Sequence, residues 1–205
     1  MHAYLTSTEY AVTGLFALIG NEEARLAELR RQLDAASKER AHAQSILYVG
    51  APPSGFGEDT TPYFEKKGRD AAREIRTLTA DIVQLEAAIG AKAFSVRALA
   101  GAVLQVAKQG LVIGCGSLQA CPPGRQVGPE VLKNIIWQGR NQAMHWEEGT
   151  FNASVTACFQ NLEQAFGARF KLDGIGAQSL AQAVLELLAW SEYAAYVRDM
   201  RSLIG

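Results

Sequence analysis

Two charged, alanine-rich stretches with a regular apolar spacing constrain the fold of this chain more than any other feature of its sequence. In each stretch, mostly apolar or small residues recur at alternating steps of three and four, which places a narrow seam along one side of a helix. The seam positions are Leu26, Leu29, Leu33, Ala36, Arg40, Ala43 and Leu47, followed by Ile75, Leu78, Ile82, Leu85 and Ile89. Such a seam is typical of helices that pair as coiled coils.

The segment between these stretches, GAPPSGFGEDTTP from 50 to 62, is rich in glycine and proline and is incompatible with a helix. We therefore expect an antiparallel helical hairpin over 22–90, inserted after a first helix, with arms about 33 Å long at about 1.5 Å per residue. The pattern leaves open whether this hairpin projects from the core or packs along it. Two amphipathic helices of one bundle are the alternative.

The remaining segments also have a helical period, and no run alternates convincingly like a strand. Thr6 and Glu9 have the spacing of a capping box and predict the start of the first helix. Its apolar face is formed by Val12, Leu15, Phe16 and Ile19. Further helices are predicted over 92–109, 129–148, 152–167 and 177–203. The predicted fold class is all-α, with a single helical domain over 1–205.

The overall charge of the chain does not indicate a class of binding partner. With 20 Lys and Arg against 21 Asp and Glu, the formal net charge is −1, so no overall basic field points to nucleic acid or a membrane. Any anion-binding site must therefore be local. The apolar run 11–20 is too short to span a bilayer and lacks the features of a signal peptide.

The cysteines are three in number, Cys115, Cys121 and Cys158, an odd set without a disulfide framework. This favours a reducing compartment, so we expect a cytoplasmic protein. Cys115 and Cys121 could form a zinc site with His145, but the sequence offers no fourth convincing ligand and no C-x-x-C pair. We therefore expect buried or incidental cysteines, no metal and no cofactor.

The predicted helix over 129–148 has two unlike faces. At about 100° per residue, one arc holds an apolar core stripe of Leu132, Ile135, Ile136, Gly139, Ala143 and Trp146. The other side holds Lys133, Asn134, Trp137, Arg140, Asn141, Met144, His145 and Glu148. Large apolar side chains away from a core stripe indicate a contact surface, so Trp137 and Met144 predict a dimer interface.

Arg140 and His145 are separated by five steps of about 100°, which places them about 140° apart around the helix axis. One copy of the helix would not aim both side chains at one small target. Two copies related by a two-fold axis could place arginine and histidine from each chain around a shared cleft. The spacing therefore favours a homodimer over a monomeric site.

The motif R-N-x-x-x-H, formed by Arg140, Asn141 and His145 on a late helix, resembles the HEPN superfamily of small helical bundles. The resemblance covers the helical core, about 90–205 plus the first helix, with the hairpin as an elaboration. It implies an endoribonuclease that acts as a dimer without a metal, in a toxin–antitoxin or phage-defence system. RNA and a regulatory antitoxin are then the expected partners.

The resemblance also implies roles for these side chains. His145 would be the acid or base in attack by the ribose 2′-hydroxyl, and Arg140 would stabilise the phosphorane. Asn141 would orient the imidazole or a phosphate oxygen. Arg125, in the loop before Pro129, and Lys133 are candidate RNA contacts, with a structured turn as the alternative at Arg125.

The motif departs from one HEPN branch, which has a modified tyrosine two residues after the histidine, where this chain has Glu147. Glu147 and Glu148 are unfavourable beside a polyanion, and Glu147 is placed to pair with Arg140. Two alternatives stay open: an interhelical bonding set at Arg140 and His145 without chemistry, and a non-catalytic helical dimer whose hairpin binds another protein.

Overall fold

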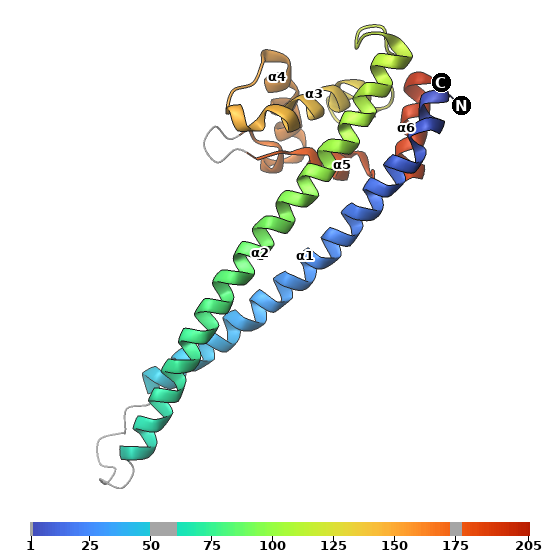
Figure 1. Ribbon diagram of the computed structural model, residues 1–205. Helices are drawn as coiled ribbons and strands as arrows, with labels where there is room; N and C mark the ends of the chain where they lie inside the picture. Colours follow the sequence, from blue (N-terminus) through green and yellow to red (C-terminus); the bar gives the residue numbers. More distant parts are fainter. Residues whose placement is uncertain (1, 50–60, 173–177) are drawn as a thin grey trace. The chain divides into compact units, whose positions relative to one another are not determined.

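The structure is a computed structural model that describes residues 2–49, 61–172 and 178–205. It is mostly helical, which confirms the predicted all-α class (Figure 1). The α-helices are α1 (Ala3–Val49), α2 (Thr61–Cys115), α3 (Leu132–His145), α4 (Ala153–Phe166), α5 (Ala181–Leu188) and α6 (Tyr193–Ile204). Two 3-10 turns, η2 (Trp146–Glu148) and η3 (Ala168–Phe170), and two short strands, β1 (Gln126–Val127) and β2 (Glu130–Val131), complete the described elements.

The chain forms two compact units. Unit 1 comprises Met1–Glu22 and Phe94–Gly205, and unit 2 comprises Glu23–Ala93. Both α1 and α2 contribute to each unit, so the expected first helix and the helix predicted over 92–109 are parts of longer helices that include the arms of the hairpin. The expectation of separate helices at the ends of the hairpin is therefore wrong. Lone glycines at those points, Gly20 and Gly90, cost about 1 kcal/mol each in a helix and are tolerated there.

The start of α1 also differs from the prediction, because the helix begins at Ala3 and not at the capping box of Thr6. The residue before it takes the capping role. Tyr4 N donates to Nδ1 of His2 at 3.2 Å, and Leu5 N donates to the carbonyl of His2 at 2.9 Å. These bonds satisfy amides that the first turn leaves without helical partners.

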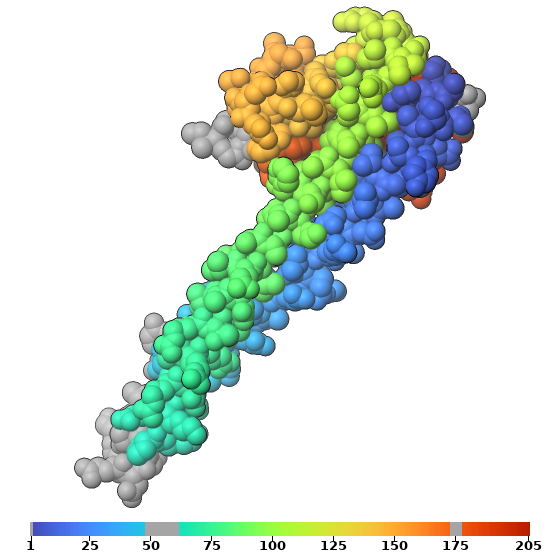
Figure 2. All heavy atoms as spheres, in the orientation of Figure 1, coloured from blue at the N-terminus to red at the C-terminus, as the bar shows by residue number. Residues whose placement is uncertain are grey.

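Unit 2 consists of the parts of α1 and α2 that carry the two seams, and these helices run antiparallel and lie against each other (Figures 1 and 2). Leu26, Ala43, Ala71 and Ile82 are buried, and most other seam positions are half-buried. Leu47 departs from the pattern and is 46% exposed. The loop predicted over 50–62 lies outside the described residues, except for Thr61 and Pro62, which begin α2.

Unit 1 is organised around the first turns of α1, the second half of α2 and the last helix. The predicted apolar face of α1 is confirmed, because Val12, Phe16 and Ile19 are buried. Tyr4 Oη donates to the carbonyl of Val106 on α2 at 2.8 Å. At the chain ends, His2 N donates to the carbonyl of Gly205 at 2.9 Å, so the two termini lie together (Figure 1).

The loop before α3 contains a β-hairpin that the sequence pattern did not predict. Gln126 pairs with Val131 and Val127 with Glu130, so Pro129 lies in the turn and not in the first turn of a helix. Gly128 has a φ of +59°, and a Cβ there would approach Phe166 to 2.7 Å. A glycine is required here, because other residues rarely adopt this conformation and the space is already filled.

The predicted helix over 177–203 is two helices, α5 and α6. The chain turns at Ala189, whose φ is +56°, and Trp190 follows with its side chain buried. Trp190 Nε1 donates to Oδ2 of Asp199 at 2.8 Å. Arg125 Nε donates to Oδ1 of Asp199 at 2.9 Å and its Nη2 donates to Oδ2 at 2.9 Å. The buried carboxylate of Asp199 thus joins Trp190, just after the break, to the exposed Arg125 from before α3.

A disulfide joins Cys115, at the end of α2, to Cys121 in the following loop, with 5.2 Å between the Cα atoms. The expectation of unpaired cysteines is therefore wrong, and the argument for a reducing compartment loses its premise. The third thiol, Cys158, is free and buried. Burial, together with the charge of Glu130, raises its pKa to about 12, so it stays protonated and unreactive at neutral pH.

Alkylation should reveal this pairing. Denatured, unreduced protein treated with iodoacetamide should gain a single modification, at Cys158, because the other two sulfurs have no free thiol. After reduction with dithiothreitol, all three cysteines should react, as measured by mass spectrometry of the intact chain and its peptides. Modification of Cys115 or Cys121 before reduction would contradict the disulfide.

Replacing Asp199 should destabilise the fold strongly. Asp199→Ala leaves the guanidinium of Arg125 and the indole N–H of Trp190 without their acceptor, so we expect the free energy of unfolding to fall by roughly 3 kcal/mol. The measurement is urea denaturation followed by far-ultraviolet circular dichroism. Asp34→Ala is the matched control, because the ion pair of Asp34 with Lys38 is exposed and should contribute little. Equal effects of the two changes would refute the buried network.

Candidate functional site

The core stripe of α3 positions every candidate residue on this helix. Leu132, Ile135, Ile136 and Gly139 are buried, as the helical pattern predicted. A Cβ on Gly139 would lie 3.2 Å from Cγ1 of Val184 on α5, so the two helices approach closely at this point. The remaining face of α3 is thereby turned away from the core.

Two glutamines on α3, Gln138 and Gln142, are buried, which the sequence pattern did not predict. Gln142 Nε2 donates to the carbonyl of Gln178 at 2.9 Å, and its Oε1 accepts from the N–H of Leu180 at 2.8 Å. Gln142 therefore anchors the segment that leads into α5. A glutamine has no sequence signal for such a role, because its partners are backbone groups about 36 residues away.

Trp137 and Met144, the predicted dimer contacts, differ in their surroundings. Trp137 is half-buried, and Nζ of Lys108 on α2 lies 4.6 Å from the centre of its ring. Contacts within the chain thus bury part of the Trp137 side chain. Met144 is 54% exposed, one of several large apolar side chains of the described residues with an exposed surface. Of the two predicted contacts, Met144 is the exposed one.

Arg140 is held by neutral groups. Its Nε donates to Oε1 of Gln105 on α2 at 2.5 Å, and its Nη1 donates to Oδ1 of Asn141 at 3.3 Å. No ion pair involves Arg140 within the described residues, so the expected pairing with Glu147 is not present. Because amides orient the guanidinium without neutralising it, its positive charge remains available to an anion.

His145 pairs with Glu148, one of the two acidic residues that are unfavourable beside a polyanion. Its Nδ1 lies 2.6 Å from Oε1 of Glu148, and the histidine side chain is 50% exposed. A carboxylate only accepts hydrogen bonds, so this contact favours the tautomer with the proton on Nδ1, in which Nε2 is the nitrogen that can act as a base. The orienting partner of His145 is thus Glu148 and not Asn141, whose Nδ2 donates to Gln138 at 3.4 Å.

A hollow of about 480 Å³ brings two of the three motif residues together. Asn141, His145 and Glu148 line one side, and Asn152 and Val155 of the first turn of α4 line another. Asn152 caps α4 by accepting from the N–H of Val155 at 2.9 Å. Arg140 is not among the lining residues and adjoins the hollow through its bond with Asn141.

The two predicted RNA contacts are engaged elsewhere. Arg125 binds Asp199 and also donates from Nη2 to the carbonyl of Leu188 at 2.8 Å. Lys133 Nζ donates to the carbonyl of Cys121 at 2.6 Å. Neither residue lines the hollow, and these bonds give both cations a structural role. We therefore leave them out of the candidate site.

The described residues hold no group of three or more His, Cys, Asp or Glu side chains arranged to bind a metal. The zinc set considered from the sequence does not form, because Cys115 and Cys121 are joined to each other and His145 pairs with Glu148. Among the residues that line the hollow, His145 and Glu148 are the titratable pair.

One helix, over Pro62–Cys115, contains a stretch that is long and apolar enough to cross a membrane by length and composition. Of that stretch, 39% is buried inside the structure. Core helices of soluble proteins meet the same two criteria, so this stretch does not by itself establish membrane insertion.

Comparison with protein-family models, with curated proteins and with solved structures finds no match to this chain. The chemistry of the site must therefore be argued from its own residues.

Proposed function

We propose that the chain is a HEPN-like endoribonuclease that cleaves RNA without a metal and acts as a dimer. The observation that carries this proposal is the pair of His145 and Glu148 at an open hollow, with the uncompensated cation Arg140 bonded to the hollow's Asn141. These side chains offer a base, an orienting carboxylate and a positive charge, which are the groups that phosphodiester cleavage by a 2′-hydroxyl requires.

In the proposed reaction, Nε2 of His145 takes the proton from the ribose 2′-hydroxyl, whose oxygen then attacks the adjacent phosphorus. The bond from phosphorus to the 5′-oxygen breaks, and that oxygen takes a proton from water, which leaves a 2′,3′-cyclic phosphate and a 5′-hydroxyl. The imidazolium then returns its proton to solvent. Glu148 holds the imidazole by its Nδ1–H and stabilises the imidazolium that forms. DNA lacks the 2′-hydroxyl and is not a substrate by this route.

Arg140 supplies charge to the phosphorane, and the geometry supports its doing so across a dimer. Within one chain its guanidinium is bonded to Gln105 on α2, whereas His145 opens to the hollow beside α4. Within one chain, Arg140 is thus held on the side of α2, and His145 lies on the side of α4. An arginine from a second chain could complete the site of His145, and exposed Met144 lies on the same helix to make the contact.

The second candidate is a non-catalytic helical module that binds another protein. The exposure of Met144 and of Phe94, 54% and 53%, favours this class, because large exposed apolar side chains mark contact surfaces. A role as a toxin or phage-defence component, restrained by an antitoxin, belongs to the first candidate only. RNA cleavage by the purified protein therefore separates the two.

Purified wild-type protein should cleave total RNA and tRNA in the presence of a metal chelator. His145→Ala should lower the cleavage rate at least about 100-fold, because general acid–base catalysis contributes about 10² to 10⁴ in rate. Glu148→Gln should cause a smaller loss, since it keeps the shape but removes the charge that stabilises the imidazolium. The measurement is the rate of appearance of 2′,3′-cyclic phosphate ends.

His42→Ala is the matched control, because His42 is an exposed histidine of unit 2 outside the hollow and its replacement should leave the rate unchanged. Equal rates for wild type and His145→Ala, with both proteins folded, would contradict the proposed catalytic role. Wild-type protein that cleaves no RNA would favour the protein-binding module. A His42→Ala variant as inactive as His145→Ala would contradict the assignment of catalysis to the hollow of His145.

Mixing two inactive variants should test whether the site is shared between chains. If His145 of one chain works with Arg140 of the other, a heterodimer of Arg140→Ala with His145→Ala keeps one intact site of two. Random exchange places half of the chains in heterodimers, so activity should recover to roughly a quarter of the wild-type value. A site built within one chain would give no recovery, and this outcome would refute the shared cleft.

A further inference from the structure

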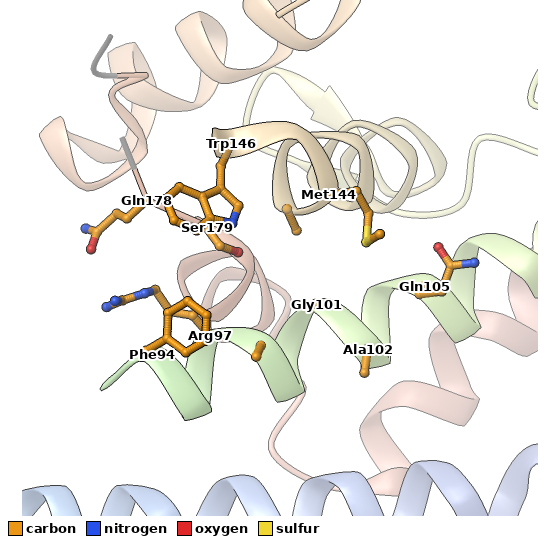
Figure 3. A pocket seen from close by; sticks show the side chains of 11 residues that line it. Phe94, Arg97, Gly101, Ala102, Gln105, Met144, Trp146, Gln178 and Ser179 are labelled. Atoms are coloured by element: carbon orange, nitrogen blue, oxygen red, sulfur yellow. The ribbon is translucent and has the colours of Figure 1, made fainter. Parts of the chain in front are cut away.

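A second hollow of about 400 Å³ lies within unit 1, between the second half of α2 and the end of α3 with η2 (Figure 3). Phe94 and Arg97 of α2 lie together at one end, below the indole of Trp146. Met144 of α3 lines the other end. This volume falls in the range of small-molecule sites, about 300 to 1,000 Å³.

Arg97 is the unusual feature of this hollow. Its side chain is half-buried, and within the described residues no hydrogen bond or ion pair engages its guanidinium. By contrast, Arg125 and Arg140 of the same unit are both held by several acceptors. Partial burial lowers the pKa of Arg97 from its ordinary value, which reports the cost of keeping the charge there without an anion.

The rest of the hollow is suited to a flat apolar body. The α2 side is formed by small residues, among them Ala98 and Ala102, which leave the space open. Phe94, 53% exposed, and Trp146 offer aromatic faces. The edge formed by Gln178 and Ser179 is held in place by the bonds of buried Gln142 to Gln178 and Leu180, so the hollow is pre-formed.

We propose that this hollow binds a small organic monoanion, a carboxylate with a flat aromatic body, with Arg97 on the carboxylate and Phe94 and Trp146 on the rings. A single cation matches a single negative charge, and the planar guanidinium fork matches the two oxygens of a carboxylate. Aromatic side chains pack on flat apolar groups by offset or edge contacts. This proposal rests on other side chains than the ribonuclease proposal, because none of these three residues lines the hollow of His145.

Titration calorimetry with 2-naphthoate as the probe tests the site, with the neutral isostere 2-naphthalenemethanol as its partner ligand. Wild-type protein should bind the acid more tightly than the alcohol. Arg97→Gln should weaken binding of the acid about tenfold and leave the alcohol within about twofold, because a charged hydrogen bond at a half-exposed site contributes at the low end of its usual range. Arg198→Gln, which removes an exposed arginine of α6, should change neither affinity.

A second variant keeps the test decisive if Arg97→Gln does not fold. Ala98 is exposed on α2 and lines the hollow, so Ala98→Leu should fill the space without disturbing the core and abolish binding of both ligands. No binding of 2-naphthoate to wild type at millimolar concentration would overturn the proposal. Equal affinities for acid and alcohol, or unchanged binding by Arg97→Gln or by Ala98→Leu, would overturn it as well.

Discussion

The close approach of α3 to α5 at Gly139 is the contact on which the functional part of the molecule depends. A Cβ at this position would lie 3.2 Å from Val184, which is tighter than most contacts, and 3.5 Å from Leu104, which is an ordinary contact, so a larger residue would press first on α5. With Gly139 in place, the buried stripe of α3 fixes the rotation of the helix about its own axis. That rotation decides where Arg140, Asn141 and His145 point.

Because of this rotation, α3 borders both hollows of unit 1. Asn141 and His145 line the first, and Ala143 and Met144 line the second. Gln105 connects them, since it lines the second hollow and accepts a 2.5 Å bond from Arg140.

The sequence predicted where the long helices lie, but it did not predict where they begin and end. The seams around Leu26 and Ile82 and the face of Val12 and Phe16 predicted helices correctly, because many residues report one period. The break at Ala189 is accompanied by the bond of Trp190 to Asp199, nine residues later, and the turn at Pro129 by the pairing of β1 with β2. Neither interaction appears in the helical period from which the helices were predicted.

The sequence by itself determined the all-α class, the core stripe of α3 and the residue types at the candidate site, because these follow from local periodicity and side-chain chemistry. Only the tertiary structure decided which partners those side chains have. Glu148 follows His145 by only three residues, so this pair was within reach of a local pattern, whereas Gln105 reaches Arg140 from α2, 35 residues earlier in the chain. Hydrogen bonds act over about 3 Å, so a partner that is distant along the chain is decided by folding.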